Sequence, residues 1–201
     1  MSGTLIDPEM EAFPDRHRWT VEACYRLMDL GFINGRFEVI DGEVISKVGQ
    51  KPLHAACLMC LLHALVALFG ADHIRMQSPI ELPGEDGIYT EPEPDAAVTT
   101  GAIVSYLTRH PQPQELALVV EVSDTSLRTD TIVKSRLYAR VGIQEYWIVD
   151  MTTRSLHVYR NPQGDSYSLV TVLSEAETVT PLASPNRSIA VSSLFPPEPL
   201  A

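Results

Sequence analysis

The sequence predicts a single domain of the α/β (α+β) class, in which helices pack on a mixed central β-sheet. Three patterns favour this class. Residues 115–123 form an almost continuously apolar run, ELALVVEVS, which is typical of a central strand buried on both faces. Residues 52–69 and 129–141 have the apolar patterns of helices. Residues 36–48 alternate around a turn, as the two strands of a hairpin do.

The ends of the chain differ in character from its middle. Residues 1–18 are polar and contain proline, so we expect a flexible lead-in before one domain at residues 19–195. The proline-bearing tail, residues 196–201, should be frayed. At 201 residues, with 45% hydrophobic content, the chain is large enough to fill one core.

The first half of the domain should contain a helix, a hairpin and a longer helix. Thr20 is the N-cap of a helix that ends at Gly31, and the Asp41-Gly42 pair predicts a hairpin with strands at 36–41 and 43–48. The helix at 52–69 begins with Pro52 and stops at Gly70. The remaining strands are predicted at residues 73–82, 95–99, 115–123, 144–150, 154–160 and 166–173, with the helix at 129–141 after the third of these.

Charge and cysteine content bound the environment and the partners. The net charge of −11 opposes binding of polyanions over the whole surface, so a phosphate-binding surface must be local. No apolar run reaches the roughly 18 residues of a membrane span, and the N-terminus lacks the pattern of a secretory signal. With three cysteines and no pairing framework, we expect a soluble protein of the reducing cytoplasm.

Lys134 falls inside the apolar face of the helix at 129–141. On a helical wheel of 100° per residue, Val133, Leu137 and Tyr138 surround it. A buried ammonium costs several kcal/mol unless a charged group pairs with it. Asp130, one turn earlier, and Glu121, at the end of the preceding strand, can supply that group. A structural salt bridge or a lysine that extends to solvent would explain the pattern equally well.

Asp95 adds a second carboxylate. It begins a short strand, whereas Glu121 ends a fully apolar one, so the two acids can meet on adjacent strands and chelate a hard cation such as Mg²⁺. A lysine beside such a site can orient an attacking water or stabilise charge on a phosphate. Asp95 alone could also be a turn residue after Pro94.

These residues belong to an ordered set that resembles the Uma-two (Uma2) family of restriction-endonuclease-like proteins, within the PD-(D/E)XK nuclease superfamily. The resemblance spans roughly residues 36–150. It rests on Glu38, Asp41-Gly42, His54, Pro94-Asp95, Glu121-Val122, Asp130, Lys134, Tyr138, Gly142 and Glu145-Tyr146-Trp147.

The resemblance implies a restriction endonuclease-like core with Asp95 and Glu121 as metal ligands. The superfamily lysine usually lies two residues after the second acid, where this chain has Ser123. Lys134 resembles a migrated form of that lysine. Glu38 would be a third ligand, although it could instead be an exposed strand residue. Because its same-face neighbour Ile40 is apolar, we expect the face of Glu38 to be covered.

Several other signals carry less information. His54, Cys57, Cys60 and His63 spread over half of the helix circumference and cannot converge on one zinc ion. His54 resembles a family histidine that lines the cleft, but a capping or packing role is equally consistent. Arg128 belongs to a locally basic segment, 126–142, which could contact phosphate or form a solvated helix face. The serines near residue 123 lack a Gly-x-Ser-x-Gly turn.

We therefore predict a metal-dependent endonuclease that hydrolyses DNA phosphodiester bonds with Mg²⁺ or Mn²⁺. Asp95, Glu121 and Glu38 would hold the metal, and Lys134 would assist the attacking water. The alternative is a catalytically inactive module with the nuclease fold that binds nucleic acid or protein. A homodimer would supply two sites for the two DNA strands, and no membrane is expected as a partner.

Overall fold

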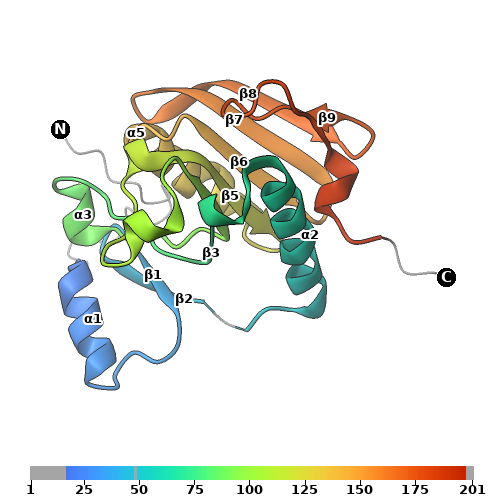
Figure 1. Cartoon of the computed structure of the whole chain (residues 1–201). Helices are drawn as coiled ribbons and strands as arrows, with labels where there is room; N and C mark the ends of the chain where they lie inside the picture. Colours follow the sequence, from blue (N-terminus) through green and yellow to red (C-terminus); the bar gives the residue numbers. More distant parts are fainter. Residues whose placement is uncertain (1–16, 48, 198–201) are drawn as a thin grey trace.

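The computed structural model describes residues 17–47 and 49–197 (Figure 1). The predicted lead-in at 1–18 and the predicted tail at 196–201 lie almost entirely outside the described residues. The domain boundary predicted at 19–195 stays a prediction.

A six-stranded sheet forms the centre of the molecule, in the order β3-β4-β5-β6-β7-β8. The β5 and β6 strands run parallel, and each of the other neighbours is antiparallel. The sheet is therefore mixed, as the sequence predicted. Its strands are β3 (Ile74–Met76), β4 (Ala96–Thr99), β5 (Leu116–Ser123), β6 (Glu145–Asp150), β7 (Ser155–Gln163) and β8 (Ser166–Ser174).

Helices cover both faces of this sheet, which explains why β5 is apolar on both sides. The α2 helix (Pro52–Phe69) packs Leu61 and Leu65 against Leu118 and Val120 on one face. On the other face, Leu137 of the α5 helix (Ser135–Arg140) packs with Val119 and Ile148. The predicted fold class is confirmed, and Figure 1 shows α2 in front of the strands.

A hairpin and a first helix lie beside the sheet. The α1 helix (Val21–Asp29) begins at Thr20, whose Oγ1 accepts a hydrogen bond from the N–H of Ala23 at 3.1 Å. The β1 (Phe37–Ile40) and β2 (Glu43–Ser46) strands pair around Asp41 and Gly42, with φ of 50° and 80°. Positive φ at both central residues is the geometry of a type I′ hairpin turn, which Asp-Gly favours. A single bridge, Val39 to Glu91, ties the hairpin to the chain that leads into β4.

The connection between β5 and β6 differs from the regular helix that the sequence predicted. It comprises α4 (Leu127–Thr129), a π-helical turn at Asp130–Lys134 and α5. Such π turns inside helices occur frequently at functional sites. Both ends of this turn, Asp130 and Lys134, are buried.

Two further predictions needed correction. The strand expected at 73–82 ends at Met76, because Gln77 adopts a left-handed backbone with φ of 48° and leaves the sheet. The Gly- and Pro-containing acidic segment 82–95, which the sequence pattern indicates as a loop, contains a short helix, α3 (Asp86–Tyr89). The small pair β9 (Thr178–Val179) and β10 (Ile189–Ala190) near the C-terminus was not predicted.

The sequence indicated no apolar run as long as a membrane span, but α2 as a whole is, within the described residues, the one helix long and apolar enough to cross a membrane by length and composition. The same properties suit a core helix, and five of its buried side chains belong to the core cluster shared with the sheet and the C-terminal segment. Cys57 lies among these buried residues, whereas His63 is exposed on the opposite side of the helix.

Candidate active site

Asp95 and Glu121 meet on adjacent strands. The β4–β5 register pairs Ala96 with Val120, and one further step places Asp95 opposite Glu121. Directly opposed residues on an antiparallel pair project from the same face of the sheet. The backbone N–H of Val122 also donates to Asp95 Oδ2 at 2.8 Å, which fixes the first carboxylate against the second strand.

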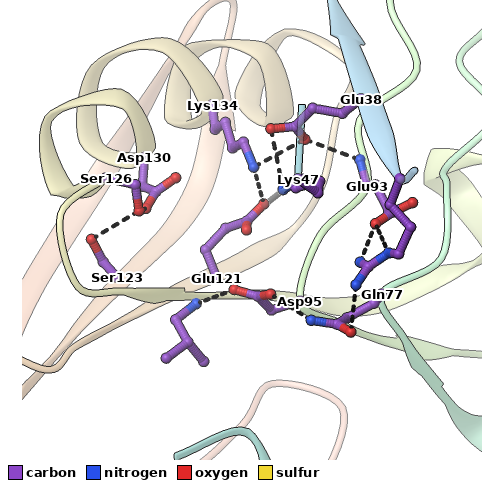
Figure 2. A network of polar contacts seen from close by, with 12 residues as sticks. Glu38, Lys47, Gln77, Glu93, Asp95, Glu121, Ser123, Ser126, Asp130 and Lys134 are labelled. Carbon is purple, nitrogen blue, oxygen red and sulfur yellow. Dashed lines mark hydrogen bonds and ion pairs between the residues drawn. The ribbon is translucent and has the colours of Figure 1, made fainter. Parts of the chain in front are cut away.

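Lys134 enters from the crossover helix and joins Glu121 to Glu38 (Figure 2). Its Nζ lies 2.9 Å from Glu121 Oε1 and 3.1 Å from Glu38 Oε2. The same oxygen of Glu121 accepts a hydrogen bond from the hydroxyl of Tyr138 at 3.0 Å. All four side chains are buried. The ammonium therefore points inward, as the wheel predicted, and pairs with two carboxylates from distant parts of the chain.

Glu38 lies at the site on a covered face of the hairpin. Its exposure is 4%, and that of Ile40 is 5%, so the apolar neighbour had indicated the burial correctly. Glu38 Oε1 lies 3.2 Å from the Nζ of Lys47, and Glu38 Oε2 accepts a hydrogen bond from the N–H of Glu93 at 3.2 Å. The interpretation as an exposed strand residue is wrong.

Asp95 faces two further polar side chains. His54 Nε2 lies 3.7 Å from Asp95 Oδ1, and Gln77 Nε2 donates to the same oxygen at 3.4 Å. Gln77 in turn accepts a hydrogen bond from Arg36 at 2.8 Å. Of the roles left open for His54, the structure favours a place beside the acid, in the first turn of α2.

Asp130 is buried next to the same helix turn, but its carboxylate makes a different contact from the one expected. Its Oδ2 accepts a hydrogen bond from Ser126 Oγ at 2.6 Å, and that hydroxyl lies 3.3 Å from Ser123 Oγ. The wheel assumed α-helical spacing, which stacks residues four apart, whereas the π turn changes that spacing. Asp130 acts on Lys134 as a nearby negative charge.

The basic residues of the crossover lie mainly on its solvent side. Arg136 pairs with Asp165 at 2.7 Å and Arg140 with Asp86 at 2.5 Å. These pairs agree with a solvated helix face for both arginines. Arg128 is exposed on α4, outside the buried cluster.

The pKa values of the buried groups reflect a surplus of negative charge. Burial raises the pKa of Glu121, and the carboxylates of Asp130 and Asp95 add to this rise against the opposing effect of Lys134. Burial also raises the pKa of Asp130. Burial alone would lower the pKa of Lys134, but Glu121 and Glu38 outweigh it and hold that pKa well above the ordinary value. The lysine is therefore charged, while its surroundings hold more carboxylates than cations.

The other two acids are better compensated. Burial would raise the pKa of Glu38, but Lys134, Lys47 and the N–H of Glu93 bring it below its usual value. Burial acts on Asp95 in the same direction, but the neighbouring His54 and the hydrogen bond from the Val122 N–H bring its pKa below the usual value. Both groups are held as carboxylates, the form that binds a cation.

Three polar residues of the site were missed in the sequence. Lys47 could have been found from the hairpin register: Glu38 pairs with Ile45, and residue 47 lies two positions further on the same face. Tyr138 is part of the family pattern and lies on the buried side of the helical wheel, but the sequence did not predict that its hydroxyl donates to Glu121. Gln77 gave no signal, because its place beside Asp95 depends on the left-handed backbone at the end of β3.

The donor chemistry fits a hard divalent cation held by two protein carboxylates. Within residues 17–47 and 49–197, no three His, Cys, Asp or Glu side chains form a group that could hold a metal ion. Mg²⁺, however, keeps several waters and is usually bound through one or two carboxylates together with substrate phosphates. Asp95 and Glu121 provide such a pair on one face of the sheet. Burial raises the pKa of Glu121, and a cation beside it would oppose that rise by favouring the carboxylate form.

Comparison of the chain with known protein families identifies the family to which it belongs. A family model described as "Putative restriction endonuclease", Uma2, matches residues 29–192. The chain belongs to the Uma2 family. The matched region contains every residue of the buried cluster, from Glu38 to Tyr138. No curated protein matches the chain.

A solved structure resembles this Uma2 domain in its fold. It is described as the crystal structure of a putative nuclease belonging to DUF820 from Anabaena variabilis ATCC 29413. The TM-score is 0.59 at 16% sequence identity, over 84% of this chain and 96% of that one. At this identity the similarity establishes the fold. The predicted mixed α/β fold is confirmed on this basis, and it matches the fold of that nuclease structure.

Proposed function

We propose that this Uma2 protein is a metal-dependent endonuclease that hydrolyses phosphodiester bonds of DNA. The observation that carries the proposal is the buried meeting of Asp95, Glu121 and Glu38 with Lys134, from four separate elements, in a family described as restriction endonucleases. In the reaction, water adds across a P–O bond and leaves a phosphate monoester and a free hydroxyl.

Asp95 and Glu121 are the proposed ligands of Mg²⁺ or Mn²⁺, and Glu38 is a further candidate ligand. A bound cation would stabilise the negative charge that develops on the phosphoryl oxygens during in-line displacement. Tyr138 and Lys134 both contact Oε1 of Glu121 and thereby fix the orientation of its carboxylate. Lys134, which is held charged beside the acids, is proposed to assist the attacking water through its charge and through the carboxylates that it orients.

The acidic surface limits how DNA is approached. A net charge of −11 repels a polyanion at long range, so attraction must come from local cations and the bound metal. Cleavage of both strands needs two active sites, and a homodimer would provide them. The mass of the protein in solution, alone and with duplex DNA, tests the dimer.

One observation favours the alternative, a nuclease fold that binds nucleic acid or protein without cutting it. The ammonium of Lys134 lies between Glu121 and Glu38 and already supplies positive charge to both. Under this alternative, the lysine replaces the metal and the cluster is a structural salt bridge.

A plasmid-nicking assay separates the two functions. We expect the wild-type chain to nick supercoiled DNA in Mg²⁺ or Mn²⁺ and not in EDTA. Asp95→Asn and Glu121→Gln should each lower the rate by about 100-fold or more, since each removes a charged ligand while keeping the side-chain shape. Glu22→Gln is the matched control, because Glu22 is an exposed acid in a surface ion pair with Arg26.

Equal nicking by wild type, Asp95→Asn and Glu121→Gln would place the activity elsewhere or in a contaminant. Calorimetry distinguishes the remaining case. Heat of Mn²⁺ binding that Asp95→Asn abolishes supports the nuclease, whereas DNA or protein binding without any heat of Mn²⁺ binding supports the inactive module.

A further inference from the structure

The polar cluster has buried side chains, here called its floor, and partly exposed side chains, here called its mouth. The side chains of Glu38, Glu121 and Lys134 are between 3% and 4% exposed. In contrast, Lys47 is 23% exposed, and His54 and Asp95 are 17% and 13% exposed. A group that approaches from solvent therefore reaches Lys47, His54 and Asp95 before it reaches the floor.

Lys134 is poorly placed to contact a substrate phosphate. Its ammonium is engaged by both glutamates, at 2.9 and 3.1 Å, and its side chain is 3% exposed. Because the side chain is buried, Lys134 would have to move toward solvent to contact a phosphate, and such a movement away from the carboxylates would leave a buried charge unpaired, which is costly. The site needs another cation if it is to bind the phosphate directly.

Lys47 has the position and the freedom for that contact. It follows the end of β2, where its backbone N–H donates to Arg36 O at 2.8 Å and anchors the residue to the hairpin. Its Nζ lies 3.2 Å from Glu38 Oε1, and its charge lowers the pKa of Glu38, Glu121 and Asp95. An ammonium has three donors, so one can stay on Glu38 while others bind a phosphate.

We propose that Lys47 is the residue that binds the scissile phosphate at the mouth of the site. The inference rests on the proposed nuclease function. It gives the two lysines separate roles, whereas the sequence pattern assigned the catalytic role to Lys134 alone. Lys47 keeps its protons throughout and acts by charge, neutralising phosphoryl oxygens as they gain negative charge. Lys134 holds Glu38 and Glu121 in place behind it.

The test measures binding of a short duplex DNA in EDTA at several salt concentrations, for wild type, Lys47→Gln and Lys47→Arg. Each phosphate that a protein cation neutralises contributes about 0.9 to the slope of log K against log salt. We expect Lys47→Gln to reduce this slope by about 1 and Lys47→Arg to restore it. Arg26→Gln is the control, because Arg26 is an exposed cation on α1 with its own partner, Glu22.

Single-turnover cleavage in Mn²⁺ supplies the second readout. Lys47→Gln should slow cleavage by about 100-fold, and Lys47→Arg should recover part of the rate. Thermal unfolding of Lys47→Gln checks the fold, which should persist because Glu38 keeps Lys134 and the Glu93 N–H.

The outcomes separate this inference from the nuclease proposal. An unchanged salt slope, or cleavage by Lys47→Gln within about threefold of wild type, overturns the role of Lys47 and leaves the nuclease standing. A reduced slope in a protein that never cuts DNA supports Lys47 as the phosphate contact and refutes catalysis. Wild-type protein that binds no duplex DNA overturns both.

Discussion

Replacement of Lys134 by methionine removes the buried charge on which the cluster depends while keeping a long side chain. The ammonium contacts Glu121 at 2.9 Å and Glu38 at 3.1 Å, and the side chain is 3% exposed. At an effective dielectric constant near 20, each contact corresponds to about 5–6 kcal/mol of Coulomb attraction. The cost of desolvating the three charges offsets most of this gain.

The net loss of folding stability in Lys134→Met therefore depends on the carboxylates that remain buried without the ammonium. Removal of one partner of a buried ion pair typically costs about 3–5 kcal/mol, which in a domain of this size lowers Tm by about 6–20 °C. Lys47 and the Glu93 N–H still stabilise Glu38, so the cost should fall mainly on Glu121. Lys51→Met, at an exposed pair with Asp124, should change stability by less than about 1 kcal/mol.

The pH dependence identifies the mechanism. The pKa of Glu121 is higher in the folded state than in the unfolded state, where it is near 4.5. The contribution of Glu121 to folding stability is therefore fully present below the unfolded-state pKa and is lost as pH rises through the folded-state pKa. Without Lys134 that folded pKa rises further. Urea unfolding at pH 5 and pH 8 should therefore show a larger loss in Lys134→Met at pH 8. A variant as stable as wild type at both pH values would refute the buried ion pair.

Three other substitutions test the fold outside the buried cluster. Gly42 and Gly142 have similar backbone angles, with φ of 80° and 82°. Their surroundings differ: a Cβ added at Gly42 would lie 2.7 Å from the Cα of Arg18, whereas a Cβ added at Gly142 would have no atom within 4 Å. In the same urea assay, Gly142→Ala should lower the free energy of unfolding by about 1 kcal/mol because of backbone strain, and Gly42→Ala should lower it clearly more. Equal losses in the two variants would contradict the close approach of Arg18 to Gly42. Arg160→Met should lower the free energy of unfolding by about 3–5 kcal/mol, because Glu145 is fully buried and accepts two hydrogen bonds from Arg160. A loss below about 1 kcal/mol would show that Glu145 does not need this partner.

The sequence was most informative where local pattern and burial agree. The run at 115–123 lacked alternation because β5 lies between two helical layers and pairs with the parallel strand β6. Asp41-Gly42 located the hairpin because its turn requires positive φ at both positions. Lys134 was placed inward because Leu137 and Tyr138 surround it in the apolar arc.

The sequence was least informative where contacts depend on irregular backbone. The π turn cannot be read from a wheel that assumes α-helical geometry, so the contact of Asp130 with Ser126 was missed. Gln77 reaches Asp95 because it leaves β3 in a left-handed conformation, which a residue other than glycine rarely adopts. Lys47 lies outside the family pattern, although the hairpin register places it on the face of Glu38.

The position of a divalent cation tests the central claim most directly. Crystals soaked in Mn²⁺ can be examined by anomalous scattering, which locates the ion without reference to activity. The proposal predicts one peak between the carboxylates of Asp95 and Glu121, and its loss in Asp95→Asn. A map with no peak there, with Lys134 still bridging Glu121 and Glu38, would contradict the metal-dependent mechanism.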